Sequence, residues 1–185
     1  MYILNSEEIF FLNDFTEKIK KIIPEDLKDL NQYVFYGNEI KADDILLCAK
    51  KFPMMGNKQL IIVKNGNKIL KEIDKIISQK QSIPESTVLV ICLDGVKINA
   101  KMKDLKINEE YGAIYDFKKI YDNKMPNWIK YLAQRSGFKI DFKTCELIKE
   151  RTGNNLSKVK IEFEKISLNT QSSEIRSDLI AEHFG

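Results

Sequence analysis

The stretch Lys50–Asn65 reads KKFPMMGNKQLIIVKN, and it contains the change of pattern from which the fold can be predicted. A helical pattern that precedes it stops at Phe52-Pro53, and Gly56 then turns the chain. The apolar run Leu60–Val63 follows. A short apolar run bounded by turn residues is typical of a strand buried on both faces of a parallel sheet.

Two methionines, Met54 and Met55, lie between the end of that helical pattern and the turn. Two large, flexible apolar side chains in this place suit a docking tip, because methionine adapts its shape to a partner groove. The alternative is that both side chains fold back and fill the core. The spacing alone leaves these two interpretations open.

The same two patterns alternate through the first part of the chain. Further short runs predict strands at Tyr2–Leu4, Tyr33–Tyr36, Val88–Leu93 and Ala113–Phe117. Apolar residues spaced three and four apart predict helices between the strands, on three stripes: Leu12, Phe15, Ile19 and Ile22; Ala42, Ile45, Leu46, Ala49 and Phe52; Ile69, Leu70, Ile73, Ile76 and Ile77. Val88–Leu93 is the most continuous run and is expected to be a central strand. This alternation predicts a wound, largely parallel α/β sheet with flanking helices.

After Lys118 the pattern becomes helical, and no strand is predicted. We expect Asp122-Asn123 to cap a helix with Pro126 in its first turn, Asp141 to cap a second helix and Asn155 a third. A short fourth helix is expected after Ser172-Ser173. The predicted domains are therefore 1–121, an α/β domain, and 122–185, a small all-α domain. We also expect that the chain is cut before a further domain.

Composition limits the class of protein. The chain has 185 residues, a net charge of +3 and 31% charged residues, a balance that does not by itself indicate a nucleic-acid partner. Three cysteines without metal-ligand spacing (Cys48, Cys92 and Cys145) indicate buried thiols in a reducing compartment. No apolar stretch is long enough to span a bilayer, and no signal peptide precedes the first strand. We expect a cytoplasmic protein with no membrane contact.

The sequence lacks the motifs that an enzyme of this architecture would need to bind and hydrolyse a nucleotide. An α/β sheet followed by a helical lid is the plan of the AAA+ nucleotide-binding proteins, whose first strand leads into a Gly-rich phosphate loop ending in Lys-Ser/Thr. Here that turn consists of Asn5, Ser6, Glu7 and Glu8, which lack the glycine and the lysine and add negative charge where a triphosphate would bind. The third strand ends in Lys64-Asn65 rather than in acidic magnesium ligands, and Asp94 is expected to be a turn residue. We therefore expect a degenerate nucleotide site, no cofactor, no metal and no catalysis.

Several segments, in order along the chain, carry a resemblance to a known family. Ala49–Met55, followed by Gln59–Lys64, resembles the delta subunit of the bacterial DNA polymerase III clamp loader, and the Pro-Met-Met form is similar to that of members from Bacteroidetes-like bacteria. Further segments resemble the same family: Tyr2-Ile3-Leu4 with Glu7-Glu8 and Phe10-Phe11, Ser86–Val90, Met125–Ile129, and Gly153–Ser157 with Glu162–Lys165. The resemblance covers nearly the whole chain.

The resemblance implies an AAA+ fold that does not hydrolyse ATP and a DNA-replication function. Delta subunits hold the ring-shaped sliding clamp (the beta subunit) open by inserting a hydrophobic pair into a pocket on the clamp. That pair would fall on Met54 and Met55, flanked by Phe52 and Pro53. The lid arginine of ATP-competent relatives would fall at Ser157. A collar domain absent from this chain would join the protein to the other clamp-loader subunits. The protein would be classed with DNA-directed DNA polymerase only as a subunit of the holoenzyme.

Three rival interpretations come from other classes. One is an active P-loop ATPase, which the Asn5 to Phe10 turn disfavours. A second is a nucleic-acid-binding module that uses Lys97, Lys101, Lys103 and Lys106, although no aromatic residues for base stacking are interleaved with them. These lysines match the linker helix of the family that the chain resembles, and Lys97, Lys101 and Lys103 are possible DNA contacts. We expect DNA to be contacted indirectly or weakly. A third is a scaffold without a clamp partner.

Overall fold

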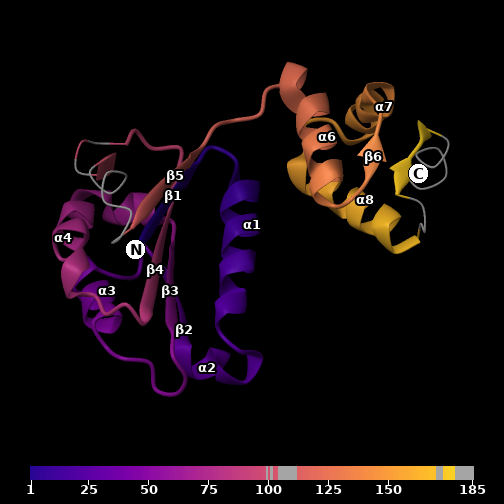
Figure 1. Ribbon diagram of the computed structural model, residues 1–185. Helices are drawn as coiled ribbons and strands as arrows, with labels where there is room; N and C mark the ends of the chain where they lie inside the picture. Colours follow the sequence, from indigo (N-terminus) through magenta and orange to yellow (C-terminus); the bar gives the residue numbers. More distant parts are fainter. Residues whose placement is uncertain (99, 101, 104–111, 170–172, 178–185) are drawn as a thin grey trace. The chain divides into compact units, whose positions relative to one another are not determined.

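The computed structural model describes residues 1–98, 100, 102–103, 112–169 and 173–177 (Figure 1). Its contacts divide the chain into two compact units, Met1–Lys119 and Ile120–Gly185. The division falls close to the boundary expected after residue 121.

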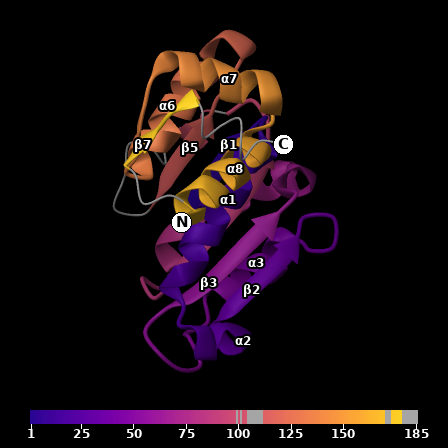
Figure 2. The ribbon, with the colours of Figure 1, turned by 90° about the vertical axis from the view of Figure 1, so that its right-hand side faces the viewer.

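The first unit is built on a parallel sheet of five strands: β1 (Tyr2–Ser6), β2 (Gln32–Tyr36), β3 (Gln59–Lys64), β4 (Thr87–Asp94) and β5 (Ala113–Phe117). The strand order is β2-β3-β4-β1-β5, and every neighbouring pair is parallel. Figure 2 shows β2 and β3 side by side with their arrows in the same direction. The predicted α/β fold class and the central position of the Val88–Leu93 run are confirmed.

Helices cover both faces of this sheet (Figure 1). One face carries α1 (Ile9–Ile19), followed by the short helices Lys20–Ile22, Glu25–Leu27 and α2 (Lys28–Asn31). The other face carries α3 (Ala42–Ala49), the 3-10 helix Gly66–Glu72, α4 (Ile73–Ser78) and the 3-10 turn Lys80–Ser82. Two apolar clusters fill the space between sheet and helices, because successive strand residues point to opposite faces.

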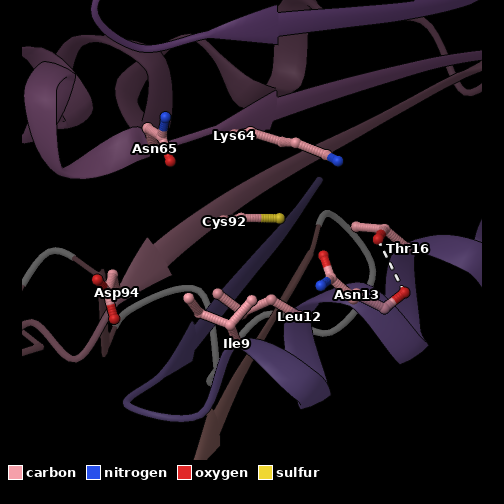
Figure 3. Close-up of a pocket in the computed structure, with 8 residues that line it drawn as sticks. All are labelled: Ile9, Leu12, Asn13, Thr16, Lys64, Asn65, Cys92 and Asp94. Carbon is pink, nitrogen blue, oxygen red and sulfur yellow. Dashed lines mark hydrogen bonds between the residues drawn. The ribbon is translucent and has the colours of Figure 1, made fainter. Parts of the chain in front are cut away.

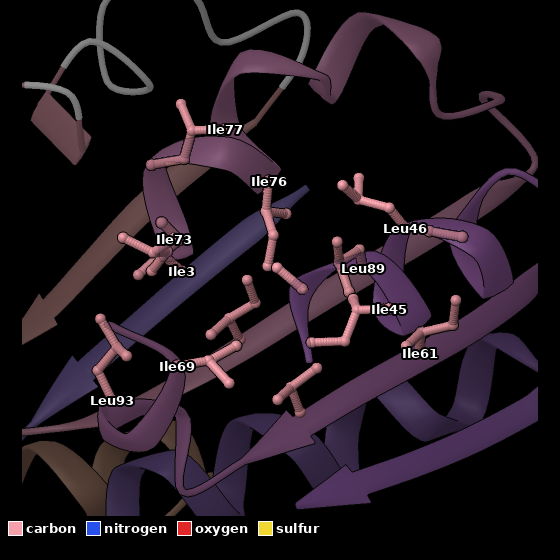
Figure 4. Packing of buried hydrophobic residues seen from close by; sticks show 14 of the residues in the cluster. Ile3, Ile45, Leu46, Ile61, Ile69, Ile73, Ile76, Ile77, Leu89 and Leu93 are labelled. Atoms are coloured by element: carbon pink, nitrogen blue, oxygen red, sulfur yellow. The ribbon is translucent and has the colours of Figure 1, made fainter. Parts of the chain in front are cut away.

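The larger cluster lies on the α3 and α4 face (Figure 4). Its fully buried members include Ile3, Ile45, Ile61, Ile73, Ile76, Leu89, Ile91 and Leu93. The smaller cluster, beneath α1, consists of Leu4, Leu12, Ile23, Leu60, Ile62, Val90 and Cys92. The sheet is therefore buried on both faces at its centre, as the continuous apolar runs predict.

Two details of the predicted helical stripes are wrong. Helix α3 ends at Ala49, so Phe52 lies outside it and its side chain is exposed. The cause is Pro53, since the residue before proline avoids helical backbone. Ile22 lies in a 3-10 turn beyond α1 and is also exposed, because the helix ends at Ile19.

The second unit contains a 3-10 turn (Asp122–Lys124), α6 (Met125–Arg135), α7 (Phe142–Thr152) and α8 (Leu156–Asn169). It also contains two short parallel strands, β6 (Lys139–Ile140) and β7 (Glu174–Ile175), so the expectation of helices alone is wrong. Strands of two residues are too short to show a periodic signal.

The predicted helix caps are confirmed in part. The Asp141 carboxylate accepts a hydrogen bond of 2.6 Å from the Thr144 amide, and the Asn155 side chain accepts one of 2.9 Å from the Lys158 amide. The predicted cap at Asp122-Asn123 is wrong, because these residues form the 3-10 turn and no side chain caps α6 at Lys124. Asp122 pairs with Lys149 instead.

Candidate functional site

The loop that connects α3 to β3, residues 50–58, carries the most exposed group of large apolar side chains among the described residues of the first unit. Phe52 is 73% exposed, Met54 71% and Met55 61%, while Pro53 is half-buried. Core packing of the two methionines is therefore excluded. We call residues 52–55 the apolar tip.

The backbone of the apolar tip is held by Asn31, the last residue of α2. The amide of Met54 donates a hydrogen bond of 2.9 Å to Asn31 Oδ1, and Asn31 Nδ2 donates one to the carbonyl of Met55. The Asn31 side chain is itself buried. One side chain thus fixes both ends of the Met54-Met55 dipeptide while the two methionine side chains stay outside.

A second buried side chain holds the start of the loop. Gln59 Nε2, at the first residue of β3, donates hydrogen bonds to the carbonyl of Lys51 and to the Thr87 hydroxyl. After the tip, Gly56 has a φ of 77°, and a Cβ there would lie 2.9 Å from Leu27 Cδ1. Glycine permits both the backbone angle and this close approach. The loop is therefore anchored before, at and after the tip.

A second candidate region is the expected nucleotide site, where the connection from β1 to α1 consists of Glu7 and Glu8. The Ser6 hydroxyl accepts a hydrogen bond of 3.0 Å from the Glu8 amide. Asn5 is buried, and its amide group exchanges two hydrogen bonds of 2.9 Å with the backbone of Val96. A two-residue connection is far shorter than a phosphate loop, so it does not form the ring of backbone amides that cradles a triphosphate.

Beside this connection lies a small pocket of about 110 Å³ (Figure 3). It lies between α1 and the ends of β3 and β4, and its lining consists of Ile9, Leu12, Asn13, Thr16, Lys64, Asn65, Cys92 and Asp94. Burial raises the pKa of the Cys92 thiol to about 11, although nearby Lys64 opposes the shift. The thiol is therefore protonated at neutral pH and is a poor nucleophile.

The pocket also does not supply a magnesium site. Asp94 is the acidic residue among the described lining residues, and the Asp94 backbone exchanges hydrogen bonds with the side chain of Asn67, in the 3-10 helix that follows β3. In the ranges described above, no group of three or more His, Cys, Asp or Glu side chains is arranged to hold a metal ion.

The remaining predicted residues belong to neither of these two segments of the chain. Lys97 and Lys103 are exposed, whereas Lys101 and Lys106 lie outside the described residues. Ser157 is exposed on α8 in the second unit. Within the part of the chain that the structure covers, no helix is long and apolar enough to cross a membrane.

Sequence reasoning found the apolar tip but missed Asn31 and Gln59, the residues that hold it. Asn31 is 23 positions from Met54 along the chain, and Gln59 is 28 positions from Thr87. A polar residue next to a strand usually indicates a turn, so a single sequence carries no signal for these contacts.

Comparison with known proteins adds a family relationship. The family model for DNA polymerase III, delta subunit, matches residues 2–111. The chain is 24% identical over 176 residues to DNA polymerase III subunit delta of Bacillus subtilis (strain 168), which covers 90% of this chain and 51% of that protein. It is 20% identical over 182 residues to the probable DNA polymerase III subunit delta of Aquifex aeolicus (strain VF5), covering 90% of this chain and 49% of that protein.

A solved structure shares the fold. The Bacillus subtilis DNA clamp loader delta protein superposes with a TM-score of 0.85 at 23% identity, over 98% of this chain and 57% of that chain. The chain spans about half the length of the curated relatives that it matches.

Proposed function

The chain belongs to the DNA polymerase III delta subunit family, and on this premise we propose that it binds the sliding clamp through its apolar tip and helps to hold the ring open during DNA replication. Its other partners in this proposal are the remaining clamp-loader subunits, with DNA contacted indirectly or weakly. Lys97 and Lys103, both exposed, are the described candidates for that contact, and Lys101 belongs to the same proposal.

One observation carries the proposal: three large apolar side chains are exposed on a loop whose backbone is fixed by buried polar groups. Exposed apolar groups on a rigid support resemble the anchors that dominate protein interfaces, where a few large side chains enter a pocket on the partner. A rigid loop also loses little conformational entropy on binding.

We further propose that the subunit acts without binding or hydrolysing nucleotide. The connection after β1 is too short for a phosphate loop, and Glu7 and Glu8 place negative charge at the start of α1. Neither an active ATPase nor a nucleic-acid module has a comparable observation in its favour. The proposed contribution is thus mechanical, with the free energy of tip insertion stabilising an open clamp.

The experiment that tests the proposal is a titration of the chain with the purified sliding clamp of its own organism. Replacing both Met54 and Met55 by alanine is expected to leave the melting temperature almost unchanged, since exposed positions contribute little to stability. Burying one methionine side chain contributes roughly 1.5 to 3 kcal/mol. The double variant should therefore bind the clamp about 100- to 10,000-fold more weakly.

A matched control uses the exposed apolar residues Ile161 and Leu168 on α8. Their replacement by alanine removes exposed apolar side chains from the second unit and should leave clamp affinity unchanged. An equal loss of clamp affinity in both double variants would indicate nonspecific adhesion and contradict the proposal. An unaltered clamp affinity after replacement of both methionines would also contradict it.

A further inference from the structure

We propose that Asn31 is a positioning residue for clamp binding, which holds the apolar tip in its binding conformation before the partner arrives. This inference rests on the proposed function, since it explains how the same tip would reach its affinity. Asn31 itself is only 1% exposed and does not touch the partner in this scheme.

The geometry of the two hydrogen bonds points to this role. The amide of Met54 belongs to the peptide group before the dipeptide, and the carbonyl of Met55 belongs to the peptide group after it. Asn31 accepts from the first and donates to the second, so both peptide planes are oriented by one side chain. The directions in which the two methionine side chains leave the backbone follow from these planes.

Two other asparagine side chains of the first unit bond a backbone amide and a backbone carbonyl in the same way. Asn5 grips the amide and carbonyl of Val96, and Asn67 grips those of Asp94 at 2.8 and 3.0 Å. In both cases the backbone groups belong to a single residue, and Asn5 also donates a hydrogen bond of 2.8 Å to the Asp116 carboxylate. Asn31 instead grips two successive residues whose large apolar side chains are exposed.

The expected effect follows from populations. If the tip without Asn31 adopts its binding conformation about one-tenth to one-hundredth of the time, the apparent affinity falls about 10- to 100-fold, because only the competent fraction binds. Contacts made by the methionines themselves stay the same. Removal of the Asn31 side chain should therefore reduce clamp affinity less than replacement of both methionines does.

The first measurement needs no variant. Hydrogen exchange of the Met54 amide in the free wild-type chain reports directly on its hydrogen bond to Asn31, because an exposed loop amide exchanges rapidly unless it is bonded. Protection of about 100-fold or more is expected. Exchange at the rate of an unstructured peptide would overturn the proposal.

The second measurement compares clamp affinity and melting temperature for Asn31→Ala, Asn5→Ala and the double methionine variant, at a temperature where each is folded. Asn5 is the control, because it is a buried asparagine outside the tip that also bonds a backbone amide and a backbone carbonyl, with one further hydrogen bond to the Asp116 carboxylate. Both asparagine variants should melt earlier. Asn31→Ala should bind the clamp more weakly and should lose the hydrogen-exchange protection of the Met54 amide, whereas Asn5→Ala should do neither.

The outcomes separate the two proposals. Weak binding by the double methionine variant together with unchanged binding by Asn31→Ala would overturn the positioning role and leave clamp docking standing. Equal affinity losses in Asn31→Ala and Asn5→Ala would show a general effect of destabilisation and would also overturn it. Failure of the wild-type chain to bind the clamp would remove the proposed function, and the positioning role with it.

Discussion

Gln59 and Thr87 face each other across β3 and β4, and their side chains share a hydrogen bond of 2.7 Å from Gln59 Nε2 to Thr87 Oγ1. Both side chains are buried. The same Gln59 nitrogen also donates to the carbonyl of Lys51. This pair therefore connects the N-terminal edge of the sheet to the loop that carries the apolar tip.

Removing this pair should weaken the first unit by a measurable amount. Thr87→Val keeps the side-chain volume but removes two hydrogen bonds, the one accepted from Gln59 and a longer one of 3.5 Å donated to the Lys51 carbonyl. It should lower the free energy of unfolding by about 0.5 to 1.5 kcal/mol for the shorter bond and by less for the longer one. Gln59→Ala should cost more, because the Lys51 carbonyl then keeps only the longer hydrogen bond of 3.5 Å from the Thr87 hydroxyl. Urea unfolding of both single variants and the double variant would measure the coupling, and strict additivity would contradict a direct interaction.

Gly56 should be intolerant of a side chain for two separable reasons. Its φ of 77° disfavours other residues, and a Cβ would meet Leu27 Cδ1 at 2.9 Å. Gly137 is the matched control, because its φ is 84° and a Cβ there would meet nothing within 4 Å. Backbone strain of this kind costs about 1 to 3 kcal/mol. Thermal denaturation should show a larger loss for Gly56→Ala than for Gly137→Ala, and an equal loss would show that the Leu27 contact is unimportant.

The chain should not bind ATP. The connection after β1 is Glu7-Glu8, and the Asn5 amide group is already engaged by Val96. A bound nucleotide would raise stability by RT ln(1 + [L]/Kd), so millimolar MgATP should leave the melting temperature unchanged. A P-loop ATPase measured in parallel provides the positive control. A saturable upward shift for this chain would contradict the prediction.

The second unit should become less stable in acid through Asp141. The hydrogen bond from the Thr144 backbone amide holds the pKa of the Asp141 carboxyl below its ordinary value of 3.8. A carboxyl whose pKa is lowered by folding stabilises the folded state fully above its unfolded pKa, and this contribution is lost as the pH falls through the folded value. The melting temperature should therefore fall between pH 7 and pH 2, and protonation of Asp141 should contribute to this fall.

Asp141→Asn tests that assignment, because asparagine caps helices nearly as well but does not titrate in this range. Its decline in acid should be shallower than that of the wild type. Some decline should remain, because the hydrogen bond from Lys149 also lowers the pKa of Asp122. Identical pH profiles for wild type and Asp141→Asn would rule out a contribution from the cap.

The sequence alone determined the sheet and its class. The runs Leu60–Val63 and Val88–Leu93 are apolar without interruption, which indicates burial on both faces, and the structure confirms this in β3 and β4. The caps at Asp141 and Asn155 were also predictable, because a cap and its helix are adjacent in the chain. The exposed tip could be named as one of two alternatives, since Pro53 and Gly56 both disfavour regular structure.

Only the tertiary structure decided how the tip is held and where the last strands lie. Asn31 meets Met54 and Met55 after more than twenty intervening residues, and β6 pairs with β7 although Lys139 and Glu174 are far apart in the chain. Apolar periodicity is local and repeats within a segment, so a sequence expresses it directly. A hydrogen bond from one side chain to a distant backbone has no period. It depends on where folding brings the two segments together.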